Sequence, residues 1–280
     1  MHNIALTWQQ AAILAAALGM IAIGMRYAPV DRVRRLTPFA TESFLIAALY
    51  SVWQLAGEIS VTGTSGAFSR SAWIERVEHN LHLPSELSMQ SHVIGHPALV
   101  QAANLYYATM HFTALFVFLI WLFVRHRDDY GPARTTLALT TLACLLIQLI
   151  PVAPPRLLGG GFVDTAARYG QSVYNLGLDA DELSAMPSVH VVWAVLIAWY
   201  VVRIGRGQWR WLVVVHPVLT VLVVVVTANH YWLDGIVGVV VLVACAWLQY
   251  GLRRAARVLR LRQLGRTLPQ VRSATQPVGS

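Results

Sequence analysis

Thr227-Ala228-Asn229-His230-Tyr231-Trp232-Leu233-Asp234 is a polar stretch between two apolar runs, Val218 to Val226 and Ile236 to Leu248. A histidine and an aspartate four residues apart lie one turn from each other on the same face of a helix. A histidine held by a structural hydrogen bond is the ordinary alternative. Ionisable groups are costly between membrane-spanning runs, however, so the pair His230 and Asp234 indicates a functional site.

The composition is that of an integral membrane protein. Of 280 residues, 56% are hydrophobic and 12% are charged, with a mean hydropathy of +0.55, whereas a soluble domain has about 25% charged residues. The apolar runs have the length of transmembrane helices and lack the period of two residues that a barrel strand shows. Cys144 and Cys245 fall inside apolar runs, which argues against a disulfide framework. We therefore expect an all-α polytopic membrane protein.

The apolar runs predict seven spans. They cover about residues 8–25, 41–56, 105–124, 135–152, 187–202, 211–228 and 232–252. We expect one or two interfacial helices in the connection 57–103, a polar turn at 125–134, and a second long connection at 153–186. The first span has no basic residue before it, unlike a signal peptide. The predicted parts are an N-terminal span with an arginine-rich loop (1–40), a membrane-embedded domain (41–252) and a basic tail (253–280).

The arginines predict the orientation. All 21 basic residues are arginines, and 17 of them fall in the N-terminal loop, the 125–134 turn, the 203–210 loop and the tail. The positive-inside rule puts these segments in the cytoplasm, so the N-terminus and the His230 stretch lie outside. This orientation explains the net positive charge of the chain, so no nucleic-acid partner is needed to account for it. The richness in alanine, valine and arginine favours a GC-rich bacterium, and hence a bacterial plasma membrane.

Two other segments on the outer side point toward His230. In Ser184-Ala185-Met186-Pro187-Ser188-Val189-His190, the proline suits the first turn of a helix, and the amides of Ser188, Val189 and His190 would form an anion site. An ordinary helix start with polar residues is the alternative. In Pro151-Val152-Ala153-Pro154-Pro155-Arg156-Leu157, the prolines end a span and leave Arg156 at the membrane surface, where it could also be a simple interface anchor.

Together these residues suit phosphoryl transfer. An unprotonated His230 can attack phosphorus while Asp234 fixes its tautomer, and His190 can give a proton to the leaving oxygen. Arg156, Ser188 and the Val189 amide would hold the other phosphate oxygens. This chemistry requires no metal ion and no other cofactor. The spacing of His79, His82, His92 and His96 fits no standard zinc pattern.

At these motifs the chain resembles the type 2 phosphatidic acid phosphatase superfamily, which includes the vanadium haloperoxidases. Pro187-Ser188-Val189-His190 is similar to the Pro-Ser-Gly-His motif, His230 and Asp234 match the core of the third motif, and Arg156 is the best match to the first. The resemblance covers about residues 40–252. It implies a six-helix phosphatase-type core, to which this chain would add one N-terminal span.

The chain departs from the family pattern at two basic positions. It has no lysine for the first motif, and Val223 and Val224 stand where the third motif has Ser-Arg. The branch without these residues resembles the inositol phosphorylceramide synthases. One arginine suits a phosphodiester, with one charge, better than a monoester, so a lipid phosphodiester is the expected substrate. Arg168 could supply a second cation and weaken this argument.

Other residues are candidates for contacts with the substrate: Asp164, Tyr174 and Asn175 for a headgroup, His111 for tuning the site, and Asn229 and Tyr231 beside the nucleophile. The expected partners are membrane lipids as substrate and water, a polyol or a lipid alcohol as acceptor; the sequence does not decide the oligomeric state. A polyprenyl or phosphatidic acid phosphomonoesterase is the alternative enzyme. A proton-coupled lipid transporter or flippase is the alternative of another class, since intramembrane His and Asp also serve proton relays.

Overall fold

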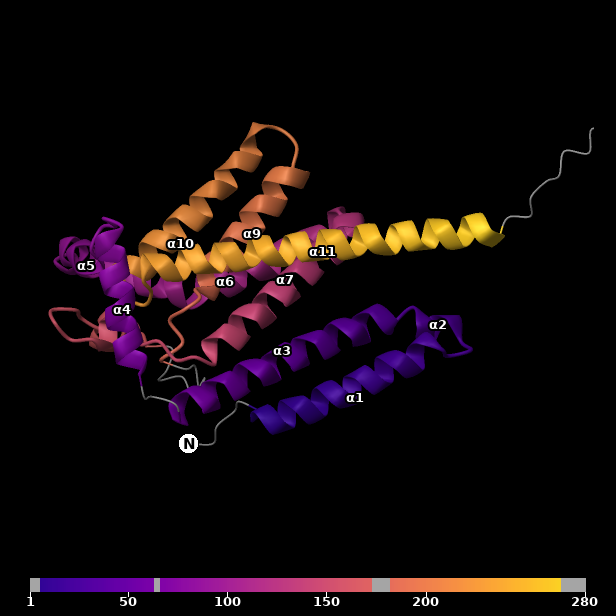
Figure 1. Cartoon of the computed structure of the whole chain (residues 1–280), viewed down its shortest axis with the longest axis horizontal. Coiled ribbons are helices and arrows are strands. Elements are labelled where there is room, and N and C mark those ends of the chain that lie inside the picture. The colour runs from indigo at the N-terminus through magenta and orange to yellow at the C-terminus, as the bar shows by residue number, and fades with distance from the viewer. Residues whose placement is uncertain (1–5, 63–65, 173–181, 268–280) are drawn as a thin grey trace, which may run out of the picture.

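The computed structural model of the chain describes residues 6–62, 66–172 and 182–267 (Figure 1). Within these ranges the secondary structure is helical, apart from one isolated bridge between Val152 and Ser184. The prediction of an all-α protein is therefore confirmed for the described part of the chain.

The described helices are, in chain order and with their bounds, α1 (Trp8–Arg26), α2 (Asp31–Arg34), α3 (Thr37–Thr62), α4 (Ala67–Asn80), α5 (Glu86–Ile94), α6 (Pro97–Arg125), α7 (Arg127–Gln148), the 3₁₀ turn η1 (Pro155–Leu157), α8 (Thr165–Arg168), α9 (Val189–Ile204), the 3₁₀ helix η3 (Gln208–Val214), α10 (Val215–Val226) and α11 (Trp232–Thr267).

The first and third helices form an antiparallel hairpin along one side of the bundle (Figure 1). A capping box between Thr7 and Gln10 starts α1. The hydroxyl of Ser51 on α3 donates to the carbonyl of Trp8 at 2.9 Å, which ties the two helices together. The hairpin also packs against α7.

The polar turn predicted at 125–134 is wrong. Helix α6 ends at Arg125 and α7 starts at Arg127, so a single residue, His126, separates them. Asp128 and Asp129 lie in the first turn of α7, where negative side chains interact favourably with the helix dipole. The charges that suggested a loop therefore belong to a helix start.

The core is built around α9, which packs against α6, α7, α10 and α11. Its side chains Val192, Leu196 and Tyr200 lie in one buried cluster with Leu122 of α6 and Leu242 of α11. Two glycines of α11 allow α9 to approach closely: a Cβ at Gly238 would lie 2.6 Å from Val192, and one at Gly235 would lie 3.4 Å from Val191.

Four helices are long and apolar enough to cross a membrane. Among the described residues they are Trp8–Arg26, Pro97–Arg125, Gln208–Val226 and Trp232–Leu259. Large apolar side chains such as Phe116, Ile120 and Val240 are exposed on them, as expected for surfaces that face lipid. The chain is consistent with a multi-pass membrane protein, although fewer helices meet this test than the seven predicted spans.

Helix α11 continues without a break to Thr267, beyond the predicted end of the last span at Leu252. At the other end of the bundle, α4 and α5 lie near the start of α11, whereas α2 lies at the far end (Figure 1). The connection 57–103, where one or two short helices were predicted, contains two, α4 and α5.

Candidate active site

The His230 stretch forms a tight, buried turn between α10 and α11. The amides of Asn229 and His230 both donate to the carbonyl of Val224, at 3.0 and 3.2 Å. Ala228 adopts the left-handed conformation, with φ of 55°, which closes the end of α10 in the manner usual for a glycine. The chain therefore reverses within a few residues and places His230 against the start of α9.

His230 is held in one orientation by its Nδ1 atom. Nδ1 lies 2.7 Å from the carbonyl oxygen of Ala185 and 3.3 Å from Oδ2 of Asp234. Because a carbonyl can only accept, Nδ1 carries the proton. Nε2 is buried and has no hydrogen-bond partner among the described residues. The lone pair of Nε2 is thus available to attack an electrophile.

Asp234 links the histidine turn to α9. It is fully buried, and its Oδ2 accepts a hydrogen bond from the Tyr231 amide at 2.8 Å. Its main-chain carbonyl accepts from the Ser188 amide at 3.0 Å. One residue therefore orients His230 and fixes the start of α9 relative to α11.

His190 lies beside His230, with ring centroids 5.6 Å apart. Tyr107 of α6 stacks on His190 at 4.3 Å, and His111 of the same helix meets it edge-on at 4.2 Å. His111 is fixed by its Nδ1, 3.0 Å from the Tyr107 carbonyl. The imidazole of His190 is therefore confined between α6 and His230.

Ser188 and Pro187 differ from the sequence prediction. Ser188 is the N-cap of α9, so Pro187 precedes the helix instead of lying in its first turn. The Ser188 amide is engaged by Asp234, and its hydroxyl oxygen accepts from the Val191 amide at 3.4 Å. The predicted set of three unpaired amides is therefore reduced to those of Val189 and His190, because the Ser188 amide bonds to α11.

Arg156 reaches the same turn from η1. Its amide donates to the Ala228 carbonyl, and its Nε donates to Oδ1 of Asn229, both at 2.9 Å. Nη1 lies 3.3 Å from Oδ2 of Asp164, and the Arg156 side chain is only 2% exposed. The structure thus brings Arg156, His190, His230 and Asp234 to one end of the bundle.

A profile of the PAP2 superfamily matches residues 72–248, which include all four of these residues and more than half of the chain. The chain belongs to the PAP2 superfamily. Membership indicates an enzyme with phosphatase-type activity. In the comparisons with curated proteins and with solved structures, nothing matches this chain.

The other residues that were predicted to contact the substrate of this PAP2 chain do not all lie beside His230. Asp164 pairs with Arg156 and also caps α8 through the Ala167 amide. Arg168 is exposed, with its guanidinium over the ring of Tyr169. Tyr174 and Asn175 lie outside the described residues. Tyr231 is 1% exposed and packs in a buried cluster with Ile74 and Val152.

The sequence reasoning missed the contribution of α4 and α5 to the PAP2 site. Glu78 of α4 accepts from the Leu233 amide at 2.7 Å, and Glu86 of α5 accepts from the Trp232 amide at 3.4 Å. The Trp232 indole donates to the Pro84 carbonyl at 2.7 Å. The first turn of α11 is thus held by residues some 150 positions earlier in the chain.

The same two helices hold the segment around Arg156. Nε of Arg70 donates to the Pro151 carbonyl at 2.6 Å, and the Ser71 hydroxyl donates to the Ala153 carbonyl at 2.7 Å. Gln90 pairs with both main-chain groups of Val163 at 2.9 Å. The connection 57–103 therefore fixes two of the three motif-bearing segments. No local sequence pattern indicates this role, because the partners are main-chain atoms.

Burial shifts the pKa of two side chains at this end of the molecule, Glu78 and Tyr231. Burial, together with the nearby Glu86 and Asp234 carboxylates, raises the pKa of Glu78 to about 9, although the Leu233 amide opposes the shift. Burial also raises the pKa of Tyr231. Both side chains are therefore protonated at neutral pH, and a protonated Glu78 can donate a hydrogen bond to Glu86.

Proposed function

We propose that this PAP2 chain is a lipid phosphatase or phosphotransferase of the bacterial plasma membrane that acts through a phosphohistidine on the extracytoplasmic side. The observation that carries the proposal is the state of His230: Nδ1 is fixed by Ala185 and Asp234, and Nε2 is left without a partner in the described chain. This is the arrangement that a nitrogen nucleophile requires.

The reaction has two steps. Nε2 of His230 attacks phosphorus, the bond from phosphorus to the leaving alcohol breaks, and His190 protonates that oxygen. His190 then takes a proton from water or from an acceptor alcohol, whose oxygen attacks phosphorus and breaks the phosphorus–nitrogen bond. The side chain of Asp234 stabilises the charge that His230 acquires, as in other aspartate–histidine pairs.

The small net positive charge around Arg156 favours a phosphodiester as the substrate. Its guanidinium already faces Asp164 at 3.3 Å, which offsets part of its positive charge. Arg168, the candidate second cation, is exposed over Tyr169. A site with little net positive charge favours one negative charge on the substrate over two. Transfer from a lipid phosphodiester, as in enzymes that resemble inositol phosphorylceramide synthases, is therefore preferred over phosphomonoester hydrolysis.

The proposed topology has seven crossings, with the N-terminus outside and the C-terminus in the cytoplasm. Helices α4 and α5 lie at one end of the bundle (Figure 1). They bond to the chain beside His230 and beside Arg156, so the candidate site lies at that end. The other end carries the arginine-rich segments around α2. The positive-inside rule then places the site outside.

The test uses the purified full-length chain in detergent with EDTA and a panel of lipid phosphodiesters and phosphomonoesters. We expect turnover that His230→Ala lowers by at least about 1,000-fold, as for removal of a nucleophile. We also expect ³²P from the substrate to remain on the parent protein as acid-labile phosphohistidine. Unaltered thermal unfolding of the variant is the control for folding.

Other outcomes of this assay would contradict the proposal or favour one of the alternatives. Full activity in His230→Ala would exclude this residue as the nucleophile. Turnover that requires an added metal ion would contradict the metal-independent reaction. Preference for monoesters would favour a polyprenyl or phosphatidic acid phosphatase, and no turnover by either form would favour the transporter alternative.

A further inference from the structure

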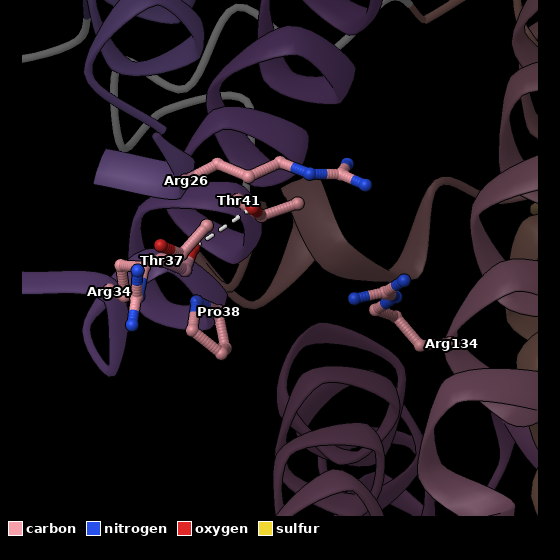
Figure 2. A pocket seen from close by; sticks show the side chains of 6 residues that line it. All are labelled: Arg26, Arg34, Thr37, Pro38, Thr41 and Arg134. Atoms are coloured by element: carbon pink, nitrogen blue, oxygen red, sulfur yellow. Dashed lines mark hydrogen bonds between the residues drawn. The ribbon is translucent and has the colours of Figure 1, made fainter. Parts of the chain in front are cut away.

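A pocket lined by three arginines lies at the end of the bundle far from the candidate active site. It has a volume of about 370 Å³ and lies between the α1–α3 hairpin and α7 (Figure 2). Pockets that bind small molecules span about 300 to 1,000 Å³. The residues that line it are Arg26, Arg34, Thr37, Pro38, Thr41 and Arg134.

The pocket carries an uncompensated positive charge. Arg34 pairs with Asp31, and Arg134 pairs with Glu42. Within the described ranges, no carboxylate forms an ion pair with Arg26, the last residue of α1. The guanidinium groups of Arg26 and Arg134 extend toward the same space from opposite sides (Figure 2). An anion between the two guanidinium groups would be attracted by both of them.

Two hydrogen-bond donors of residues that line the pocket also lack partners among the described residues. The Thr37 hydroxyl and Nε of Arg134 are buried, and neither has a hydrogen-bond partner in the part of the chain that the structure describes. The Thr41 hydroxyl donates to the Thr37 carbonyl at 2.9 Å, which keeps the start of α3 rigid. Buried polar groups are normally satisfied, so these two donors are suited to bond to an acceptor in the pocket.

The surroundings indicate that the anion belongs to a lipid. Ile23 on α1 and Phe39 on α3 are 63% and 59% exposed, beside Arg26 and Pro38. A free phosphate would leave these apolar side chains unused, whereas the acyl chains of a phospholipid can cover them. We propose that this pocket binds the phosphate of an anionic phospholipid headgroup and anchors the α1–α3 hairpin to α7.

The test is native mass spectrometry of the purified full-length chain. All variants carry His230→Ala, so that the added lipid is not turned over. The probes are phosphatidylglycerol, zwitterionic phosphatidylcholine and inorganic phosphate. Arg26→Gln removes the unpaired cation of the pocket. Arg32→Gln is the matched control, because Arg32 is an exposed arginine of the neighbouring α2 that does not line the pocket.

We expect one tightly bound phosphatidylglycerol whose affinity falls about fivefold or more in Arg26→Gln, from the loss of one arginine contact. The control should bind as the parent does, and phosphatidylcholine should bind weakly to all forms. Equal phosphatidylglycerol affinity in both arginine variants would overturn the site. Binding of inorganic phosphate that phosphatidylglycerol does not displace would overturn the lipid assignment. Neither outcome depends on the catalytic proposal, because His230 is absent throughout.

Discussion

At the scale of single residues, the proposed nucleophile is oriented by main-chain atoms as much as by its aspartate. The Ala185 carbonyl lies closer to Nδ1 of His230 than Asp234 does, 2.7 Å against 3.3 Å. Asp234 in turn is held by the Tyr231 amide. The orientation of His230 therefore depends on the correct packing of the segment before α9, and not only on the residue four positions away.

The geometry of Arg156 predicts that another cation cannot replace it. Arg156→Lys keeps the charge but loses the Nε hydrogen bond to Asn229 and the planar fork that binds phosphate. We expect kcat/KM to fall on the order of 100-fold, which equals about 2.7 kcal/mol of transition-state stabilisation. Steady-state assays with the preferred lipid phosphoester measure this.

Arg168→Ala provides the comparison, because this arginine is exposed and lies over Tyr169. Its activity toward both diesters and monoesters should match that of the parent. A selective loss of monoester hydrolysis in Arg168→Ala would show that Arg168 is a second phosphate contact and would remove the charge argument for a diester.

The raised pKa of Glu78 predicts how stability depends on pH. Glu78 binds its proton more tightly in the folded chain, with a pKa of about 9, than in the unfolded chain, where the value is 4.5. Its contribution to stability is therefore present below pH 4.5 and is lost progressively as the pH rises toward 9. Glu78→Gln should flatten this decline, measured as the unfolding temperature in detergent between pH 5 and pH 9.

Glu75→Gln is the control for that series, since Glu75 is exposed on the same helix. It should leave the pH dependence of the parent unchanged. If Glu78→Gln instead shows the full decline, ionisation of Glu78 does not limit the stability of this end of the molecule.

At the scale of elements, the site depends on how closely α9 approaches α11. Gly238 faces Val192, and its missing Cβ would lie 2.6 Å from a Val192 methyl group and 3.2 Å from the Ser188 carbonyl. Any side chain at position 238 must separate α9, which carries His190, from α11, which starts two residues after His230. We therefore expect this contact to influence the distance between the two histidines.

Gly238→Ala should therefore destabilise the chain by about 1 to 3 kcal/mol through overpacking and lower its activity. Adding Val192→Ala removes the methyl group that clashes, so the two substitutions together should cost less than the sum of their separate costs. Unfolding in denaturant and turnover are measured for all four forms of the cycle.

Gly251→Ala is the matched control on the same helix, because no atom lies within 4 Å of a Cβ at that position. It should be neutral or stabilise α11 by about 0.5 to 1 kcal/mol. Additive effects of Gly238→Ala and Val192→Ala would show that the helices do not depend on this close contact.

At the scale of the whole molecule, the two ends of the bundle differ in chemistry. One end carries α4 and α5, which bond to the first turn of α11 beside Asp234, and the other carries α2 and the arginine pocket (Figures 1 and 2). An end with the proposed site and a basic end, separated by apolar helices, are what the proposed orientation in a membrane requires.

Cysteine labelling in intact bacterial cells measures this orientation. Ser91 on α5 and Gln208 at the start of η3 are both exposed. Ser91→Cys should react with a membrane-impermeant maleimide added outside, whereas Gln208→Cys should react only after the cells are permeabilised. The parent, with Cys144 and Cys245, gives the background. The reverse pattern would place the histidine site in the cytoplasm.

The sequence by itself determined the helical class, the membrane character and the choice of residues for the proposed site. Apolar runs and the spacing of His230 and Asp234 are local properties, so they can be read without a structure. Helix α1 begins at Trp8 as predicted. The start of α7 was misplaced because Asp128 and Asp129 occur equally in loops and in the first turn of a helix.

Only the tertiary structure decided how the site is held together. The contacts of Glu78, Glu86 and Ser71 join segments far apart in sequence and are made to main-chain groups, which every residue possesses and no motif records. The same holds for Ser188, whose amide bonds to Asp234 instead of facing a ligand. Sequence specifies which side chains carry the chemistry, whereas long-range packing decides their distances and which of their hydrogen-bonding atoms stay available.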